Sequence, residues 1–221
     1  MVIRAISYGG GVQSTALLVL AAKREIDFPL AMFSNVGDDS EHPATLEYFH
    51  EVARPYAEKN GIELVELRKR PRGKERTLYQ ELTNPDSRSI GIPVRMGSGA
   101  PGRRNCTVQY KINRIASHLK VRGASAEDQA VLALGISIDE FHRMKTTTGI
   151  AWEVFEYPLI DLRLSRDDCE RIIREAGLPV PPKSSCWFCP FKRLDQWKDM
   201  KQHEPDLFEK SVELERILND R

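Results

Sequence analysis

The 221-residue sequence has no apolar run approaching the roughly 20 residues that a membrane-spanning helix needs, so no such helix is expected. Its first residues lack the basic stretch, long apolar segment and small-residue cleavage site of a secretion signal, and we therefore expect a cytoplasmic protein. The formal net charge is only +1, so the overall charge indicates neither a nucleic acid nor a membrane as a partner. The four cysteines fit a reducing compartment and a metal or redox site better than a disulfide framework.

Short apolar runs alternate along the chain with stretches of helical periodicity. This alternation predicts an α/β fold of the Rossmann-like type, with a parallel sheet flanked by helices. Prolines mark a boundary near residue 179, so we expect an α/β domain over residues 1–178 and a small helical appendage containing a cysteine pair over residues 179–221. The expected strands cover residues 2–7, 30–34, 62–67, 130–136 and 154–159, and the main helices begin near residues 13, 43, 107 and 165.

Three consecutive glycines, Gly9 to Gly11, separate the first expected strand from the first expected helix. Glycine backbone lets successive amides approach an anion, and the N-terminus of the helix adds about half a positive charge. The loop is neither a P-loop nor a dinucleotide fingerprint, because G-x-x-x-x-G-K-[ST] is absent and G-x-G-x-x-G does not fit. A tight turn that binds nothing is the alternative, but three adjacent glycines exceed what a turn needs. We therefore expect a phosphate site here.

The segment YGGGVQSTAL resembles the S-G-G-x-D-S pyrophosphate loop of the PP-loop ATP pyrophosphatases, part of the adenine nucleotide alpha hydrolase-like superfamily. Gly10, Gly11 and Ser14 match the motif. Gly9 replaces its usual serine, and Gln13 replaces its usual aspartate. Four further segments are similar to those of the phosphoadenylyl-sulfate (PAPS) reductase branch: FSNVGDDSEHPATLEYF, RRNCTVQYKINRI, LGISIDEFHRMK and YPLIDLRLSRDD. The superfamily also includes sulfurtransferases that act on tRNA or DNA.

The resemblance implies that the loop holds the phosphates of an adenine nucleotide, with ATP and Mg²⁺ as cofactors and cleavage between the α and β phosphates. Ser7 and Gly135 lie at the ends of the first and fourth expected strands, where a parallel sheet opens its ligand crevice. The nucleotide-binding residues expected on this basis are Ser7, Gly9, Gly10, Gly11, Gln13, Ser14, Thr15, Asn35 and Gly135.

Charged residues elsewhere in the matching segments are the expected catalytic groups. Lys111, Arg143 and Arg104 are candidates to neutralise the phosphate charge, which is the main task of the protein in such a reaction. Asp38 is the expected catalytic carboxylate near Mg²⁺, with Asp39 and Glu41 beside it. A solvated acidic turn is the alternative interpretation of these three carboxylates.

Cys186 and Cys189 form a C-x-x-C motif, a spacing at which two thiolates bind one metal ion or one edge of a cluster. Together with Cys106 they offer three thiolates, so we expect a [4Fe-4S] cluster in which one iron lacks a cysteine and could carry hydrosulfide as the sulfur donor. Cys169 falls on the apolar face of a helix and is expected in the core. Zn²⁺ is the other candidate metal, with one of three residues completing a tetrahedron: Cys169, His118 or His142.

Three functions are compatible with these motifs. The first is an ATP-dependent PP-loop enzyme that adenylates a substrate for iron–sulfur-assisted sulfur transfer to tRNA or DNA, with basic residues 68–76 and 103–104 on the nucleic acid. The second is a PAPS reductase-like sulfonucleotide reductase, although the nucleophilic cysteine of that family lies in a C-terminal segment and the last cysteine here is Cys189. The third is a non-catalytic nucleotide- or metal-binding subunit of a larger assembly. A sulfur-donor protein and a second copy of the chain, forming a homo-oligomer, are further candidate partners.

Overall fold

Five strands form one sheet in the computed structural model, which describes residues 2–87, 90–94, 102–147 and 149–220. β1 pairs in parallel with both β2 and β4, and β4 pairs in parallel with β5. β2 and β3 extend the sheet on one side of β1, and β4 and β5 extend it on the other. The position between β1 and β4 is therefore the topological switch point of a doubly wound fold. The strands, in the spatial order β3-β2-β1-β4-β5, are β1 (Arg4–Tyr8), β2 (Leu30–Asn35), β3 (Glu63–Arg68), β4 (Ala130–Leu134) and β5 (Glu153–Glu156).

Helices and short turns connect the strands. β5 ends earlier than the predicted strand, because Pro158 has no amide proton for a ladder and instead starts α6. α7 begins as predicted, with a capping box in which Ser165 and Asp168 bond each other's amides. The α-helices are α1 (Val12–Ala22), α2 (Pro43–Tyr48), α3 (Arg54–Lys59), α4 (Leu78–Thr83), α5 (Asn113–Val121), α6 (Pro158–Asp161), α7 (Arg166–Glu175), α8 (Leu194–His203) and α9 (Pro205–Asn219). The short π or 3-10 segments are η1 (Phe49–Ala53), η2 (Pro71–Gly73), η3 (Thr107–Ile112) and η4 (Ile138–Arg143).

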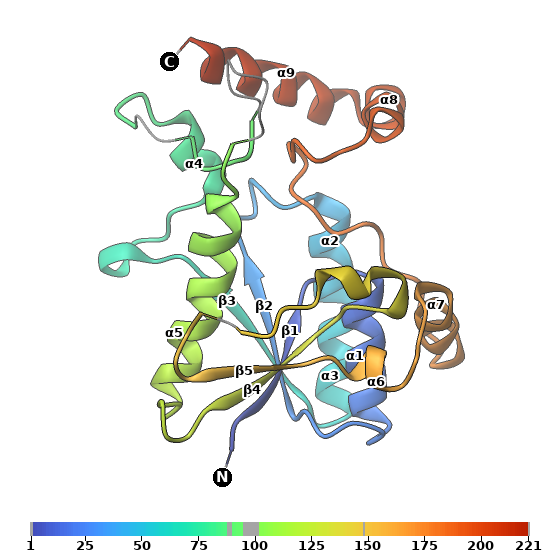
Figure 1. The fold of residues 1–221 in the computed structure, drawn as a ribbon. Helices are drawn as coiled ribbons and strands as arrows, with labels where there is room; N and C mark the ends of the chain where they lie inside the picture. The colour runs from blue at the N-terminus through green and yellow to red at the C-terminus, as the bar shows by residue number, and fades with distance from the viewer. Residues whose placement is uncertain (1, 88–89, 95–101, 148, 221) are drawn as a thin grey trace. The chain divides into compact units, whose positions relative to one another are not determined.

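Alternate residues of the central strands point to opposite faces of the sheet, and different helices cover the two faces (Figure 1). On one face, Ile6 and Phe33 belong to a buried cluster with residues of α1, η1 and α7. On the other face, Ala5 and Leu132 belong to a buried cluster with residues of α5. The predicted α/β fold, a parallel sheet flanked by helices with further helices at the C-terminal end, is confirmed.

The chain divides into two compact units. The first consists of Met1–Ser34, Ala44–Leu67 and Asn113–Ser184, and it contains most of the sheet. The second consists of Asn35–Pro43, Arg68–Ile112 and Ser185–Arg221. The sequence predicts a single division after residue 178, whereas two internal segments also join the C-terminal helices in the second unit.

The second unit has an apolar core of its own. Leu78 and Leu82 of α4, Tyr110 of η3 and the Trp187–Phe188 pair are buried in it together with residues of α8 and α9. Aromatic side chains contribute much of this core, since Trp187 packs against both Phe188 and Tyr79. None of the described helices is long and apolar enough to cross a membrane.

Candidate functional site

The glycine loop joins the end of β1 to the start of α1. Gly10 has a φ of +74°, a left-handed conformation that glycine adopts without strain. The Gly11 amide donates to Ser14 Oγ at 3.2 Å, and the Ser14 hydroxyl lies 3.0 Å from the Gly11 carbonyl. The helical ladder starts with the Thr15 amide, which donates to the Gly11 carbonyl at 2.9 Å. The preceding amides of the first turn have no acceptor inside the helix, so this end of α1 is suited to an anion.

Gly135 follows β4 and packs directly on the start of α1. A Cβ atom at this position would lie 2.9 Å from the Ser14 amide nitrogen and 3.2 Å from Gln13 Cβ. Only glycine therefore allows α1 to begin this close to the switch point, where doubly wound folds bind their ligands. Ser7 lies within β1, between Met32 of β2 and Leu134 of β4. The structure brings seven of the predicted nucleotide-binding residues together here: Gly9, Gly10, Gly11, Gln13, Ser14, Thr15 and Gly135.

Charged side chains of η4 and α7 contact Gln13, the residue that replaces the usual aspartate. The side-chain nitrogen Nε2 of Gln13 donates to Glu140 at 3.3 Å, and Arg166 donates to the side-chain oxygen Oε1 of Gln13 at 3.4 Å. Arg143 donates to the same Glu140 carboxylate at 2.6 Å. The predicted Arg143 is thus linked to the glycine loop through Glu140, and Glu140 offsets part of its charge. Glu140 and Arg166 were not among the predicted residues, since each is an ordinary charged position in the sequence.

Two residues with hydroxyl side chains at the glycine loop were not predicted from the sequence. Ser184 donates to the Gly9 carbonyl, and Thr45 Cγ2 would lie 3.1 Å from a Cβ atom at Gly10. The Thr45 hydroxyl is buried and has no hydrogen-bond partner among the described residues. A buried hydroxyl without a partner is uncommon and marks a place where a ligand could bond. The only signal in the sequence is that Thr45 lies in one of the segments similar to the reductase branch.

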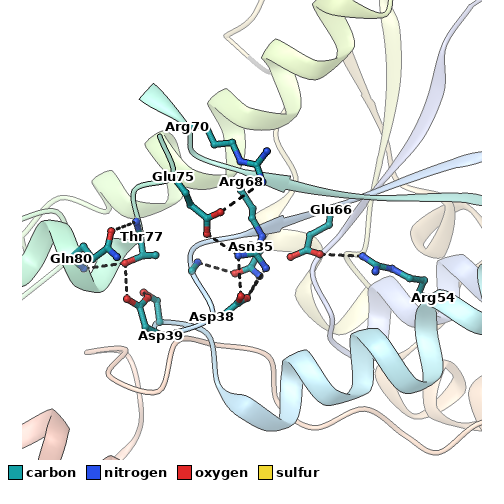
Figure 2. Close-up of polar contacts among 12 residues, drawn as sticks. Asn35, Asp38, Asp39, Arg54, Glu66, Arg68, Arg70, Glu75, Thr77 and Gln80 are labelled. Carbon is teal, nitrogen blue, oxygen red and sulfur yellow. Dashed lines mark hydrogen bonds and ion pairs between the residues drawn. The ribbon is translucent and has the colours of Figure 1, made fainter. Parts of the chain in front are cut away.

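Asp38 lies in the turn after β2, where an arginine holds it (Figure 2). Two guanidinium nitrogens of Arg68 donate to the two Asp38 oxygens at 2.6 and 3.0 Å, and Arg68 also donates to Glu75 at 2.7 Å. The predicted Asn35 donates to Asp38 at 2.8 Å and accepts from the Gly37 amide at 2.8 Å. Asn35 and Asp38 are therefore joined, and a Mg²⁺ ion would compete with Arg68 for the Asp38 carboxylate.

Asp39, the next residue, has a different set of partners. Its carboxylate accepts from the hydroxyls of Ser40 and Thr77, both at 2.8 Å. Thr77 caps α4, and it approaches Gly37 so closely that a Cβ atom there would lie 2.4 Å from Thr77 Cβ. Asp39 thus fixes the turn after β2 to the start of α4, a structural role.

Cys106, Cys186 and Cys189 are free, half-buried thiols of the second unit. Cys106 and Cys186 pack against its apolar core, and the Cys189 amide donates to the Cys186 carbonyl at 3.2 Å, which closes the C-x-x-C turn. Burial raises the pKa of Cys186, the Glu41 carboxylate adds to this effect, and Lys111 opposes it. The other two thiols also raise this pKa, so all three lie within electrostatic reach of one another.

Glu41 and Lys111 lie beside these thiols. Glu41 is 1% exposed, and neither of its carboxylate oxygens has a hydrogen-bond partner among the described residues. Lys111 Nζ stands 3.8 Å from Glu41 Oε1, which is an ion pair but too long for a hydrogen bond. The Glu41 carboxylate raises the pKa of Lys111, and the three thiols act in the same direction. Lys111, predicted to neutralise phosphate, therefore has Glu41 and the thiols as its partners.

Neither the three cysteines nor the zinc alternative forms an assembled ligand set among the described residues. Within the described ranges, no group of three or more His, Cys, Asp or Glu side chains is placed to hold a metal ion. Cys169 is fully buried in the core of the first unit, as predicted, and burial raises its pKa to about 12. His118 Nε2 accepts a hydrogen bond from Arg122 at 2.7 Å, and His142 lies against the ring of Phe141. A single Zn²⁺ ion would require its ligands to converge to about 2.0–2.3 Å from one point.

Comparison with solved structures gives a likeness to the U34-tRNA thiolase NcsA from Methanococcus maripaludis, which was solved with its [4Fe-4S] cluster. The TM-score is 0.51, and the match covers 99% of this chain and 72% of the thiolase chain at 15% sequence identity. The chain shares its fold with this tRNA thiolase. At this identity the likeness shows the fold, and the superfamily and its reductase branch both stay predictions. No protein-family model matches the sequence, and no curated protein matches it.

Proposed function

We propose that the chain is an ATP-dependent PP-loop enzyme, an ATP pyrophosphatase that adenylates a nucleic acid for sulfur transfer. The observation that carries this proposal is the glycine loop at the switch point of the sheet. Gly10 turns the chain with a positive φ, and Gly135 lets α1 begin at the ends of β1 and β4. The first amides of α1 are then available to the phosphates of ATP. The fold shared with a tRNA thiolase supports the same class of reaction.

The proposed reaction consists of an adenylation and a displacement. A substrate oxygen attacks the α-phosphorus of ATP, the bond to the bridging oxygen breaks, and pyrophosphate leaves. A sulfur nucleophile then attacks the adenylated carbon, and AMP leaves with the oxygen. The loop amides would hold the departing pyrophosphate, Arg143 would offset its charge, and Asp38 would help to hold Mg²⁺.

Cys106, Cys186 and Cys189 are the residues that would hold a [4Fe-4S] cluster. Thiolates are the usual ligands of such clusters, and these three lie in one unit with the positive charge of Lys111 beside them. When bound, a cluster with one iron that lacks a cysteine supplies a place for the sulfur to be transferred. Zn²⁺ stays the alternative for the same thiolates.

The proposed acceptor is tRNA, because the structural neighbour is a tRNA thiolase. Arg72, Lys74 and Arg76 of the basic run 68–76 are exposed, and they are candidates for contacts with the phosphate backbone. Arg68 and Lys69 of the same run are already paired with carboxylates and are less available. A sulfur-donor protein, a homo-oligomer and a cytoplasmic location stay predictions from the sequence.

The test is a reaction with the full chain purified and reconstituted without oxygen. We expect AMP and pyrophosphate to form from ATP and Mg²⁺ in equal amounts, only when unmodified tRNA is present. With sulfide added, mass spectrometry of the digested tRNA should show a thiolated nucleoside. Sulfite released from a sulfonucleotide and a thiol donor would instead identify a reductase. ATP binding without pyrophosphate release on tRNA or DNA would identify a non-catalytic subunit.

A further inference from the structure

Phe191 is an exposed aromatic residue that follows the C-x-x-C pair in the second unit. It is 50% exposed, although a phenylalanine side chain gains stability by burial. The Lys192 amide donates to the Cys189 carbonyl at 3.0 Å, and this turn fixes the point at which the Phe191 ring leaves the backbone. A single exposed ring is ordinary on a protein surface, so the groups around it decide whether it has a role.

An arginine from another segment of the second unit lies over the Phe191 ring. The guanidinium carbon of Arg104 is 4.9 Å from the ring centroid, which is the distance of a cation–π interaction. The Arg104 carbonyl accepts from the Thr107 amide at 3.1 Å, so the backbone of this arginine is also held in place. A guanidinium group on one face of an exposed ring leaves the other face for a second flat group. Nucleobases stack on aromatic rings and on guanidinium groups alike.

The charge beside the Phe191 ring is positive. Arg103 and Arg104 are both exposed, and neither forms an ion pair with a described residue. Arg193 is offset by a carboxylate, since its guanidinium group lies 2.7 Å from Asp195. The net charge of the whole chain is only +1, so the two unpaired arginines are a local feature of this surface. They suit a partner that carries negative charge.

A second aromatic ring of this segment has a cation beside it as well. The ammonium nitrogen of Lys192 lies 5.9 Å from the centroid of the Trp197 ring. Rings interleaved with cations are typical of surfaces that bind single-stranded nucleic acids, where bases stack on the rings and cations meet the phosphates. A patch of apolar side chains without these cations would instead favour a protein partner.

We propose that Phe191 and Arg104 form a stacking site for an unpaired base of the acceptor RNA, and that Arg103 contacts a neighbouring phosphate. The inference rests on the proposed function, in which tRNA is the acceptor, and it names a part of the chain that meets the RNA. Phe191 comes two residues after Cys189, and Arg104 comes two residues before Cys106, so the site adjoins both cysteine segments. Arg104 thus binds the nucleic acid in place of the ATP phosphates expected from the sequence.

The experiment measures how tightly the full chain binds RNA, by fluorescence anisotropy without ATP. The probes are a labelled single-stranded oligoribonucleotide of about 12 nucleotides and unmodified tRNA, each titrated at several salt concentrations. The proteins are the wild type, Phe191→Ala, Phe191→Trp, Arg103→Gln and Phe141→Ala. Phe141→Ala is the matched control, because Phe141 is a 66% exposed phenylalanine of the first unit, and no described cation lies over its ring. Circular dichroism checks that each variant is folded.

We expect Phe191→Ala to weaken RNA binding about tenfold or more, the scale of losing one stacked base, with an unchanged salt dependence. Phe191→Trp keeps a flat aromatic ring and should bind at least as tightly as the wild type. Arg103→Gln should bind more weakly and lower the slope of log K against log salt by about 0.7, the value for one phosphate of a single strand. Phe141→Ala should match the wild type.

Ultraviolet cross-linking of the wild type to the oligoribonucleotide gives a second measurement that does not depend on a variant. Mass spectrometry of the digested complex should place the cross-link on the peptide that contains Phe191. If Phe191→Ala does not fold, a cross-link found only on other peptides overturns the inference.

Three further results overturn the inference, and they differ in what else they overturn. Wild-type affinity of Phe191→Ala for both RNA probes removes the stacking site and leaves tRNA as the acceptor. A wild type that binds neither probe overturns both this inference and the choice of tRNA as acceptor. A wild-type dimer that dissociates in Phe191→Ala, measured by sedimentation velocity without RNA, would show that this surface binds a second copy of the chain instead.

Discussion

Gly135 lies so close to the first turn of α1 that a Cβ atom at this position would stand 2.9 Å from the amide nitrogen of Ser14. Replacing Gly135 with alanine must shift either the end of β4 or the start of α1, at a cost of about 1–3 kcal/mol. We expect Gly135→Ala to lower the melting temperature. It should also weaken the binding of a non-hydrolysable ATP analogue at least about tenfold, because a cost of about 1.4 kcal/mol to binding corresponds to a tenfold loss of affinity. Calorimetric titration and thermal denaturation measure the two effects.

Gly91→Ala is the control for this variant. Among the described residues, a Cβ atom at Gly91 would meet Leu78 Cδ1 alone, at 3.9 Å, which is ordinary van der Waals contact. Its ATP affinity should equal that of the wild type. If Gly135→Ala also binds the analogue with wild-type affinity, nucleotide binding does not depend on the junction between β4 and α1, and the proposed site is wrong.

Asp38 and Asp39 should respond differently to the same substitution. The Asp38 side chain is 61% exposed and pairs with Arg68, so Asp38→Asn should change the stability by less than about 1 kcal/mol. If Asp38 helps to hold Mg²⁺, tRNA-dependent pyrophosphate release should fall roughly a hundredfold. Asp39→Asn weakens a carboxylate that accepts hydrogen bonds from the hydroxyls of Ser40 and Thr77, so it should lower the melting temperature instead. Full turnover by Asp38→Asn over a Mg²⁺ titration would exclude Asp38 from the reaction.

The different partners of the acidic residues after β2 show where prediction from the sequence ends. The glycine loop and the strands could be predicted, because both depend on residues that are neighbours in the chain. The partners of Asp38, Asp39 and Glu41 come from β3, from the cap of α4 and from the C-x-x-C segment. Only the folded chain brings these segments together, so the sequence could place three carboxylates in one turn but could not assign each of them a role.

The two compact units also depend on segments that lie far apart in the chain. The chain leaves the first unit at the end of β2 for residues 35–43 and at the end of β3 for residues 68–112, and it returns to the first unit each time. A sequence pattern marks boundaries by prolines and glycines, and the prolines after residue 178 mark only the last of the crossings. The cysteine cluster shows the same limit, since Cys106 and the C-x-x-C pair could be grouped by residue type but not by position.

Glu153 at the start of β5 should make the stability of the chain depend on pH. It is 5% exposed, and burial raises its pKa from 4.5 to about 7. Below about pH 4 the carboxyl group is protonated in both the folded and the unfolded chain and has no effect on the pH dependence. Between about pH 4.5 and 7 the unfolded chain releases this proton while the folded chain retains it, so stability falls as the pH rises.

The difference of about 2.5 in pKa corresponds to at most about 3 kcal/mol. Glu153→Gln should therefore be more stable than the wild type at pH 8 and nearly equal to it at pH 4.5. Urea denaturation at the two pH values measures this. A constant difference between the two proteins across that range would show that the Glu153 pKa is close to its ordinary value.

Lys111 should tune the reduction potential of the metal centre proposed for the three thiolates. Reduction adds an electron to a site that already carries negative thiolates and Glu41, and the Lys111 ammonium group, 3.8 Å from Glu41, stabilises that added charge. Lys111→Met should therefore shift the midpoint potential to more negative values. Because 39% of the Lys111 side chain is exposed, water screens part of the effect. We therefore expect a shift of the midpoint potential on the order of 60 mV or less. For a one-electron reduction, about 59 mV corresponds to a tenfold change in the equilibrium constant.

An EPR-monitored redox titration of the reconstituted chain measures this potential. Lys198→Met is the matched control, since Lys198 is an exposed lysine of α8 and its loss changes the net charge by the same amount. Its potential should stay at the wild-type value. Equal potentials for all three proteins would mean that the Lys111 ammonium group does not face the bound centre. In that case the phosphate contact expected from the sequence would become the better assignment for Lys111.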